Sequence, residues 1–179
     1  MRISPILPVV VLALVACASP PPVTVARGVE LDLPSPGELG RRVEAIQMVT
    51  ARRGDDVQAF EVRISASPER LLLVGTDGLG RRVMAIDWQD GTISVERAPN
   101  VADGLRPENV LADIVLMFWP DQVLRRSVRG ATVVADGDGR RIGDAIRVNW
   151  TGDPWSGRSR LVNTSLGYEI EVRSVVVTP

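Results

Sequence analysis

The chain has 179 residues, a formal net charge of −1 at pH 7, no His and a single Cys, and all 21 of its basic residues are Arg. Its length favours one domain, and its near-neutral charge argues against a nucleic-acid partner, which requires a basic surface. Because the sequence contains neither His nor Lys, a Ser-His-Asp triad, a His-ligated metal and a Lys Schiff base are excluded. We therefore expect a protein that is not an enzyme and needs no cofactor.

Residues 1–16 are typical of a lipoprotein signal peptide. Their apolar run, 6–15, is shorter than the ~20 residues of a membrane span and matches the core of a secretory signal. It ends in Leu14-Val15-Ala16-Cys17, which resembles the bacterial lipobox and implies cleavage before Cys17 and acylation of that residue. Ala18 stands where Asp commonly marks inner-membrane retention, so we expect a lipid anchor in the outer membrane, at its periplasmic face. An ordinary signal peptide that happens to contain a Cys is the alternative.

The segment 17–37 is rich in Pro and lacks a periodic apolar pattern. It is predicted to be an extended tether, or simply a disordered terminus, ahead of a folded domain at 38–179. Ser35 with Glu38 three residues later matches a capping box, so a short helical turn is expected over 36–42.

The stretch 70–97 has three apolar runs separated by two turn signals, which predicts an antiparallel meander. Its strands are expected at 70–75, 83–88 and 92–97. Asp90-Gly91 is typical of a type I′ hairpin turn. The first loop carries Leu79, a large apolar residue between two glycines. Alternation places three residues of the middle strand on one face: Met84, Ile86 and Trp88.

Two further strands are predicted before this meander, at 43–52 and 57–66. The second alternates clearly, which places Phe60, Val62 and Ile64 on one face.

After the meander the apolar period becomes helical. A helix is predicted from Pro107 to Trp119, with apolar residues at helical spacing: Val110, Leu111, Ile114, Val115 and Phe118. Pro120 ends it, and a second short helix is expected over 121–128. A helix this apolar must lie against the apolar face of the sheet.

The chain then returns to strands, predicted at 131–135, 141–150, 160–163 and 168–177. Ile146 and Val148 share one face, as do Tyr168 and Ile170. The predicted fold class is therefore α+β: a curved antiparallel sheet, with a helix pair filling its concave side.

Few residues suggest chemistry. Asp136-x-Asp138-Gly139 resembles the start of a calcium loop, but Arg147 stands where the EF-hand needs Glu, so a plain hairpin turn is favoured. Five Arg-Arg pairs are interpreted as solvated ends of strands and helices, with contact to anionic lipid headgroups as the alternative: 41–42, 52–53, 81–82, 125–126 and 140–141. Trp155 lies in a predicted loop and is expected to be exposed.

The segment 68–85, PERLLLVGTDGLGRRVMA, resembles the corresponding hairpin of the LolB family of outer-membrane lipoprotein receptors. That hairpin has a leucine-rich strand, a short loop with a protruding Leu before Gly, and an alternating strand. The order over 110–130, a helix, a Pro and a short helix ending in Gly, also matches. The chain is further similar to uncharacterised LolB-like lipoproteins whose genes often lie beside aryl-polyene-type biosynthetic genes. The family's Pro before its Leu is absent here, where Gly78 precedes Leu79.

This resemblance implies a half β-barrel with the helices as a lid over an apolar cavity. The residues expected to line the cavity are Phe60, Val62, Ile64, Met84, Ile86, Trp88, Leu111, Val115, Phe118, Ile146, Val148, Tyr168 and Ile170. The resemblance also implies a lipid or acylated protein as ligand, a periplasmic LolA-like carrier as partner, and contact of Leu79 with the membrane or the ligand.

The predicted function is therefore binding of an apolar or acylated ligand for envelope lipid or lipoprotein transfer. The alternative is a structural lipoprotein subunit of an envelope or lipid-export complex, with a filled interior. A cavity on the order of several hundred Å3 would favour the first function.

Overall fold

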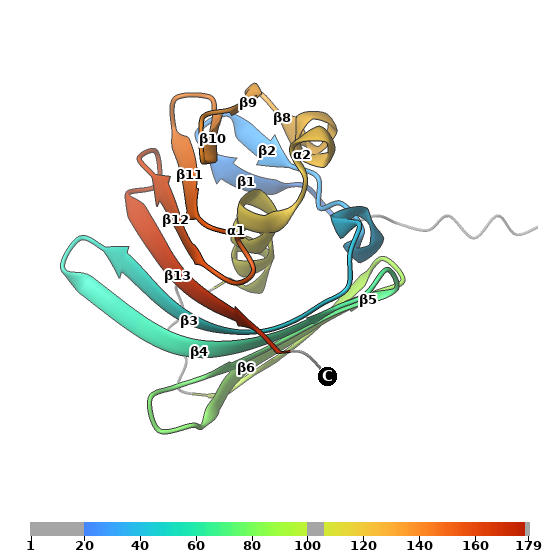
Figure 1. Ribbon diagram of the computed structural model, residues 1–179, viewed down its shortest axis with the longest axis vertical. Coiled ribbons are helices and arrows are strands. Elements are labelled where there is room, and N and C mark those ends of the chain that lie inside the picture. The colour runs from blue at the N-terminus through green and yellow to red at the C-terminus, as the bar shows by residue number, and fades with distance from the viewer. Residues whose placement is uncertain (1–19, 100–105, 178–179) are drawn as a thin grey trace, which may run out of the picture.

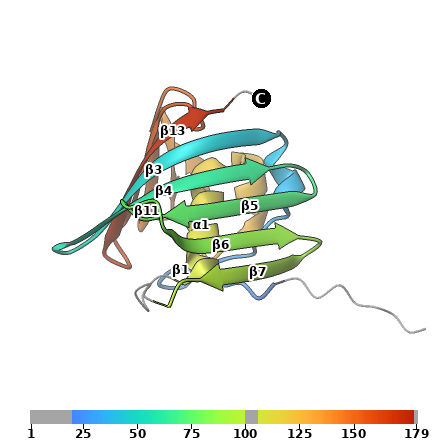
Figure 2. The same cartoon turned by 90° about the horizontal axis from the view of Figure 1, so that it is seen from below.

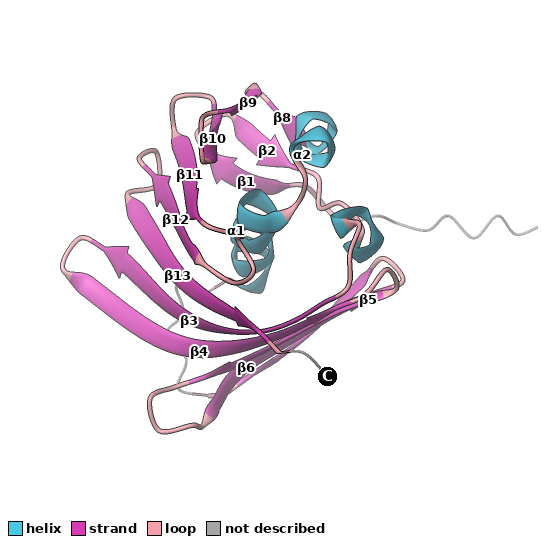
Figure 3. Cartoon of the chain, in the orientation of Figure 1, coloured by secondary structure: helices cyan, strands magenta, loops and turns pink. Residues whose placement is uncertain are grey.

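The computed structural model describes residues 20–99 and 106–177, which form two antiparallel sheets and two α-helices (Figure 1, Figure 3). The larger sheet consists of β3 (Val43–Arg53), β4 (Asp56–Ala66), β5 (Arg70–Thr76), β6 (Arg82–Gln89), β7 (Thr92–Arg97), β9 (Val133–Ala135), β10 (Gly139–Ile142), β11 (Ile146–Thr151), β12 (Arg158–Asn163) and β13 (Tyr168–Val176). These ten strands lie in the order β7-β6-β5-β4-β3-β13-β12-β11-β10-β9 and form an open, curved sheet (Figure 1). The predicted α+β class and curved antiparallel sheet are confirmed.

The sheet joins two meanders, one from each half of the chain. β3 to β7 follow one another as hairpins, and β13 returns to pair with β3, from Glu169 opposite Arg52 to Val176 opposite Ala45. The turn between β6 and β7 has φ of 51° at Asp90, a positive value that a type I′ turn requires. The meander predicted over 70–97 is thus confirmed.

The single strand predicted over 141–150 is wrong. Gly143 adopts a φ of 53°, and the turn that follows Ile142 divides this range into β10 and β11, which pair with each other. A glycine reaches this backbone conformation without steric cost, so the chain reverses direction here.

Helix α1 (Pro107–Phe118) lies in the hollow of the large sheet, and the view from below shows strands β3 to β6 passing across it (Figure 2). Pro107 has no N–H to leave unpaired in the first helical turn, and Pro120 prevents the helix from continuing. Helix α2 (Asp121–Ser127) instead packs against β9 and β8 (Val128–Arg129). The expectation of a helix pair in the hollow is therefore correct for α1 alone. In the described part of the chain, no helix combines the length and apolarity needed to cross a membrane.

The segment predicted to be a tether is largely folded. β1 (Val23–Ala26) and β2 (Val29–Leu31) form a second sheet with β8, and β1 packs against α1. Val23, Val25 and Leu31 are buried because they alternate with polar residues on a short hairpin. The tether prediction is wrong from Val23 onward, since strands of 4 and 3 residues give only a short alternating pattern. The signal peptide, Cys17 and Ala18 lie outside the described residues.

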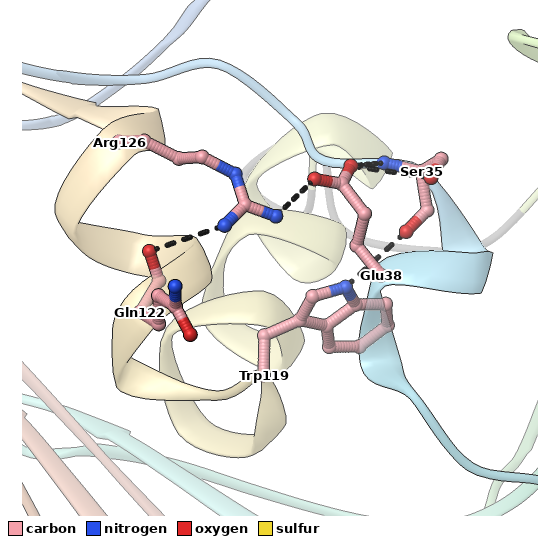
Figure 4. Close-up of polar contacts among 5 residues, drawn as sticks. All are labelled: Ser35, Glu38, Trp119, Gln122 and Arg126. Carbon is pink, nitrogen blue, oxygen red and sulfur yellow. Dashed lines mark hydrogen bonds and ion pairs between the residues drawn. The ribbon is translucent and has the colours of Figure 1, made fainter.

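The predicted capping box is present, and its residues Ser35 and Glu38 also form hydrogen bonds with Trp119 and with Arg126 of α2 (Figure 4). In the 3-10 helix η1 (Pro36–Leu39), Glu38 accepts a hydrogen bond of 2.7 Å from the Ser35 N–H. Arg126 of α2 donates to the other Glu38 oxygen at 2.6 Å, and the Trp119 indole donates to the Ser35 carbonyl at 3.3 Å. Although partial burial opposes ionisation, the hydrogen bonds from Arg126 and Ser35 hold the pKa of Glu38 below its ordinary value.

Two expectations of exposure are wrong. Arg140 is only 4% exposed, because its guanidinium caps the carbonyl of Trp119 at 2.7 Å and stacks 4.7 Å from the Trp150 ring centre. Burial lowers the pKa of Arg140 to about 10, against the attraction of Asp121. Trp155 is 2% exposed because it stacks on Phe118, with ring centres 4.4 Å apart.

Candidate ligand-binding site

An apolar cavity of about 120 Å3 lies between α1 and the concave face of the large sheet. We call it the inner cavity. The sheet contributes mainly apolar groups, including Val49, Ala51, Phe60, Val62, Leu73 and Met84. The helix contributes Val110, Ile114, Met117 and Phe118. Two polar side chains complete the lining, Gln47 and Asp113, and the Gln47 amide donates to the Ser174 hydroxyl at 3.0 Å.

A second pocket, of about 340 Å3, adjoins the inner cavity. We call it the outer pocket. The two share four lining residues: Ala51, Val110, Asp113 and Ile170. The outer pocket differs in chemistry, since it adds three exposed arginines and one exposed carboxylate: Arg52, Arg53, Arg106 and Asp56. An apolar interior thus continues into a charged mouth.

A half-buried acid, Asp113, lines both spaces where they meet. Asp113 of α1 accepts a hydrogen bond of 2.6 Å from the Tyr168 hydroxyl of β13. Burial raises the pKa of Asp113 to about 7, while the Tyr168 hydroxyl pulls this pKa down. Burial and the nearby Asp113 also raise the pKa of Tyr168, so the phenol stays protonated. Near neutral pH the Asp113 carboxyl can therefore be either neutral or ionised, while Tyr168 stays neutral.

Less than half of the predicted cavity set lines these spaces. The inner cavity includes Phe60, Val62, Met84, Phe118 and Ile170, and the outer pocket includes Tyr168 and Ile170. The other predicted residues are packed in the core: Ile64, Ile86, Trp88, Leu111, Val115, Ile146 and Val148. One example is Trp88, which stacks on Trp119 with ring centres 6.3 Å apart.

Sequence reasoning missed several residues of the site. Gln47, Val49 and Ala51 line it from β3, and their period of two was the available signal. Asp113 is a polar residue in an apolar helix, but its partner could not be predicted from neighbouring residues. Tyr168 lies 55 residues away and reaches Asp113 only when β13 pairs with β3.

The volumes limit what can bind. An apolar cavity of roughly 150 Å3 can hold a benzene-sized molecule, so the inner cavity has room for a short piece of hydrocarbon. With the outer pocket, the space reaches the range of roughly 300–1,000 Å3 typical of ligand sites. A ligand of this size would extend from the interior into the charged mouth.

The loop that carries Leu79 is held by Asp77. One Asp77 carboxylate oxygen accepts the N–H groups of Leu79 and Arg81 at 2.9 and 3.0 Å, and the other accepts Arg81 Nε at 2.8 Å. The hydrogen bonds that Arg81 donates, with a smaller contribution from the Leu79 N–H, keep the pKa of Asp77 below its ordinary value. Leu79 is 78% exposed. Because β5 runs antiparallel to β4, this loop lies at the same end of the sheet as Arg53.

The convex face has a separate hollow of about 450 Å3 over Ile46, Leu72 and Val74. Exposed Met48 and Val175 lie beside it on β3 and β13. Across the described ranges, no group of three or more His, Cys, Asp or Glu side chains could hold a metal ion. Asp136, from the calcium-like sequence, pairs with Arg141 at 3.1 Å.

The sequence profile of one protein family, described as "Protein of unknown function (DUF3261)", matches residues 44–176. No curated protein matches the chain. The matched range runs from the second residue of β3 to the last residue of β13, so it includes α1 and nearly all residues that line the two spaces. Since this match spans most of the chain, the protein belongs to the DUF3261 family of proteins of unknown function.

Proposed function

We propose that this protein binds an apolar or acylated ligand between α1 and the concave face of the large sheet, for transfer of lipid or lipoprotein in the bacterial envelope. The observation that carries the proposal is the inner cavity, whose lining is apolar apart from Gln47 and Asp113. Burial of apolar ligand surface would supply the affinity, at roughly 25 cal/mol per Å2. The outer pocket provides the route by which a ligand enters.

The LolB-like sequence features support the same function. An open curved sheet with a helix in its hollow is compatible with the half-barrel that the resemblance implies. Leu79, exposed on an ordered loop, is suited to contact a membrane or an incoming ligand. The lipobox-like sequence would anchor the protein through Cys17, and a LolA-like periplasmic carrier is the corresponding partner.

One observation favours the alternative function, a structural subunit of an envelope complex. The convex face exposes Met48 and Val175 to 53% and 66% beside an apolar hollow, as a protein-binding surface would. A subunit that acts only through this face would need no ligand in the inner cavity.

Gly75 provides a direct test of the ligand site. A Cβ atom at Gly75, which lines the inner cavity, would lie 3.6 Å from Val83 Cγ2 and 3.9 Å from the Met84 carbonyl oxygen, which are ordinary contacts. The Cβ atom of a Gly75→Val side chain therefore fits, and its two methyl groups should reduce the volume of the cavity that Gly75 lines. We expect it to weaken binding of a fluorescent naphthylamine probe by about tenfold or more, which corresponds to about 1.4 kcal/mol. Phospholipid or acylated peptide should displace the probe from the wild-type protein.

Ala85→Val is the matched control. Ala85 lies on the neighbouring strand β6 and is absent from the lining of both spaces, so the added methyl groups should leave probe affinity unchanged. Equal affinity in all three proteins would place the probe elsewhere and contradict the proposal. A wild-type protein that binds no probe would leave the structural-subunit function as the better explanation.

A further inference from the structure

We propose that the ligand is an anionic amphiphile, with its acyl chain in the inner cavity and its negatively charged head held by Arg52, Arg53 and Arg106 in the outer pocket. This inference rests on the proposed ligand-binding function and names the chemical class of the ligand.

The first support is that these three arginines lack carboxylate partners among the described residues. Of the seventeen other described arginines, twelve lie within 4 Å of a carboxylate and five do not. By contrast, Arg53 donates only to the Leu166 carbonyl, at 3.3 Å. Arg52 lies opposite Glu169 in the register of β3 and β13 and helps to lower the pKa of that carboxyl, but no ion pair within 4 Å joins them. Three cations that line one pocket without an ion pair to any described carboxylate favour a negatively charged occupant.

The second support is the balance of charge in the outer pocket. Its lining contains the three arginines and two acids, Asp56 and Asp113. Asp113 lies at the inner end, where burial favours the neutral form of its carboxyl, against the hydrogen bond from Tyr168. The exposed mouth therefore has an excess of positive charge, whereas the whole chain has a net charge of −1.

The third support is the continuity between the apolar and charged parts. Ala51 lines both spaces, and Arg53, two residues further along β3 and therefore on the same face, lines the outer pocket together with its neighbour Arg52. Val110 of α1 likewise lines both spaces, four residues after Arg106. The strand and the helix thus each present apolar surface followed by a cation, which matches an acyl chain joined to an anionic head.

Chain-matched detergents test this inference. Dodecyl phosphate, dodecyl maltoside and dodecyltrimethylammonium would each compete with the naphthylamine probe below their micelle concentrations. We expect dodecyl phosphate to bind the wild-type protein about tenfold more tightly than dodecyl maltoside, and the preference to shrink at about 0.5 M NaCl. The triple variant Arg52→Gln, Arg53→Gln, Arg106→Gln should lose the preference and keep its affinity for dodecyl maltoside.

A second triple variant, Arg147→Gln, Arg158→Gln, Arg173→Gln, removes the same charge from exposed strand positions outside both spaces and should behave as wild type. Equal affinity of the wild type for all three detergents would overturn the inference while leaving the ligand site intact. A preference that persists in the first triple variant would also overturn it. Binding of the arginines to anionic vesicles without any preference among monomeric detergents would assign them to a membrane surface instead. Failure of the probe itself to bind would refute the proposed function.

Discussion

Asp113 couples folding to pH through a single carboxyl. Its pKa of about 7 in the folded protein lies above the ordinary value of 3.8, so the folded state binds this proton more tightly. The resulting stability is fully present below about pH 4 and is lost as the pH rises toward 7. The gap between the two pKa values sets a ceiling of roughly 4 kcal/mol, which solvent in the outer pocket reduces to about 1–3 kcal/mol.

Asp113→Asn should remove this dependence. As the pH rises from 4 to 8, wild type should lose about 1–3 kcal/mol of unfolding free energy that the variant keeps. Urea unfolding of both proteins at each pH measures this difference. Tyr168→Phe removes the hydrogen bond that lowers the Asp113 pKa, so it should extend the loss of wild-type stability to higher pH. Parallel stability curves for wild type and Asp113→Asn would show that the carboxyl is well solvated.

Leu79 is the second residue whose role can be separated from folding. Because its side chain is exposed, Leu79→Glu should change the free energy of unfolding by less than about 0.5 kcal/mol. It should nevertheless slow transfer of bound probe to phospholipid vesicles, since a carboxylate is disfavoured at an apolar contact. Val134→Glu, at an exposed position of β9, is the control. Loss of stability together with transfer would mean that Leu79 contributes to packing.

At the scale of elements, the small sheet is part of the fold. Leu31 of β2 is fully buried, so Leu31→Ala should lower the free energy of unfolding by about 2–5 kcal/mol. Val175→Ala, at an exposed position of β13, should cost less than about 0.5 kcal/mol. Urea denaturation of both variants checks the difference. If Leu31→Ala leaves stability unchanged, β1 and β2 are not part of the cooperative unit.

At the scale of the whole molecule, the lipid anchor predicted from the sequence can be tested at Cys17 and Ala18. If Cys17 is the acylated residue, as proposed, Cys17→Ser should abolish incorporation of radioactive fatty acid and release the protein from the membrane. Ala18→Asp should keep the label but move the protein from the outer- to the inner-membrane fraction. Label retained in Cys17→Ser would refute the lipid anchor.

Local patterns in the sequence determined much of the architecture. Alternation identified β4, β6 and β7, a continuous apolar run identified β5, the Asp90-Gly91 pair identified a type I′ turn, and Pro107 marked the start of α1. Each of these features depends on residues that are close together in the chain, so it can be predicted without knowledge of the fold. The capping box of Ser35 and Glu38 was predictable for the same reason.

The tertiary structure alone decided which apolar residues face a cavity and which fill the core. Ile64 and Val62 share one face of β4, yet only Val62 lines the inner cavity, because the position of α1 over a curved sheet sets the space above each residue. The burial of Arg140 and the pairing of Asp113 with Tyr168 likewise depend on contacts between distant segments. Alternation specifies a face of a strand, but the distance to the opposing layer is a property of the assembled fold.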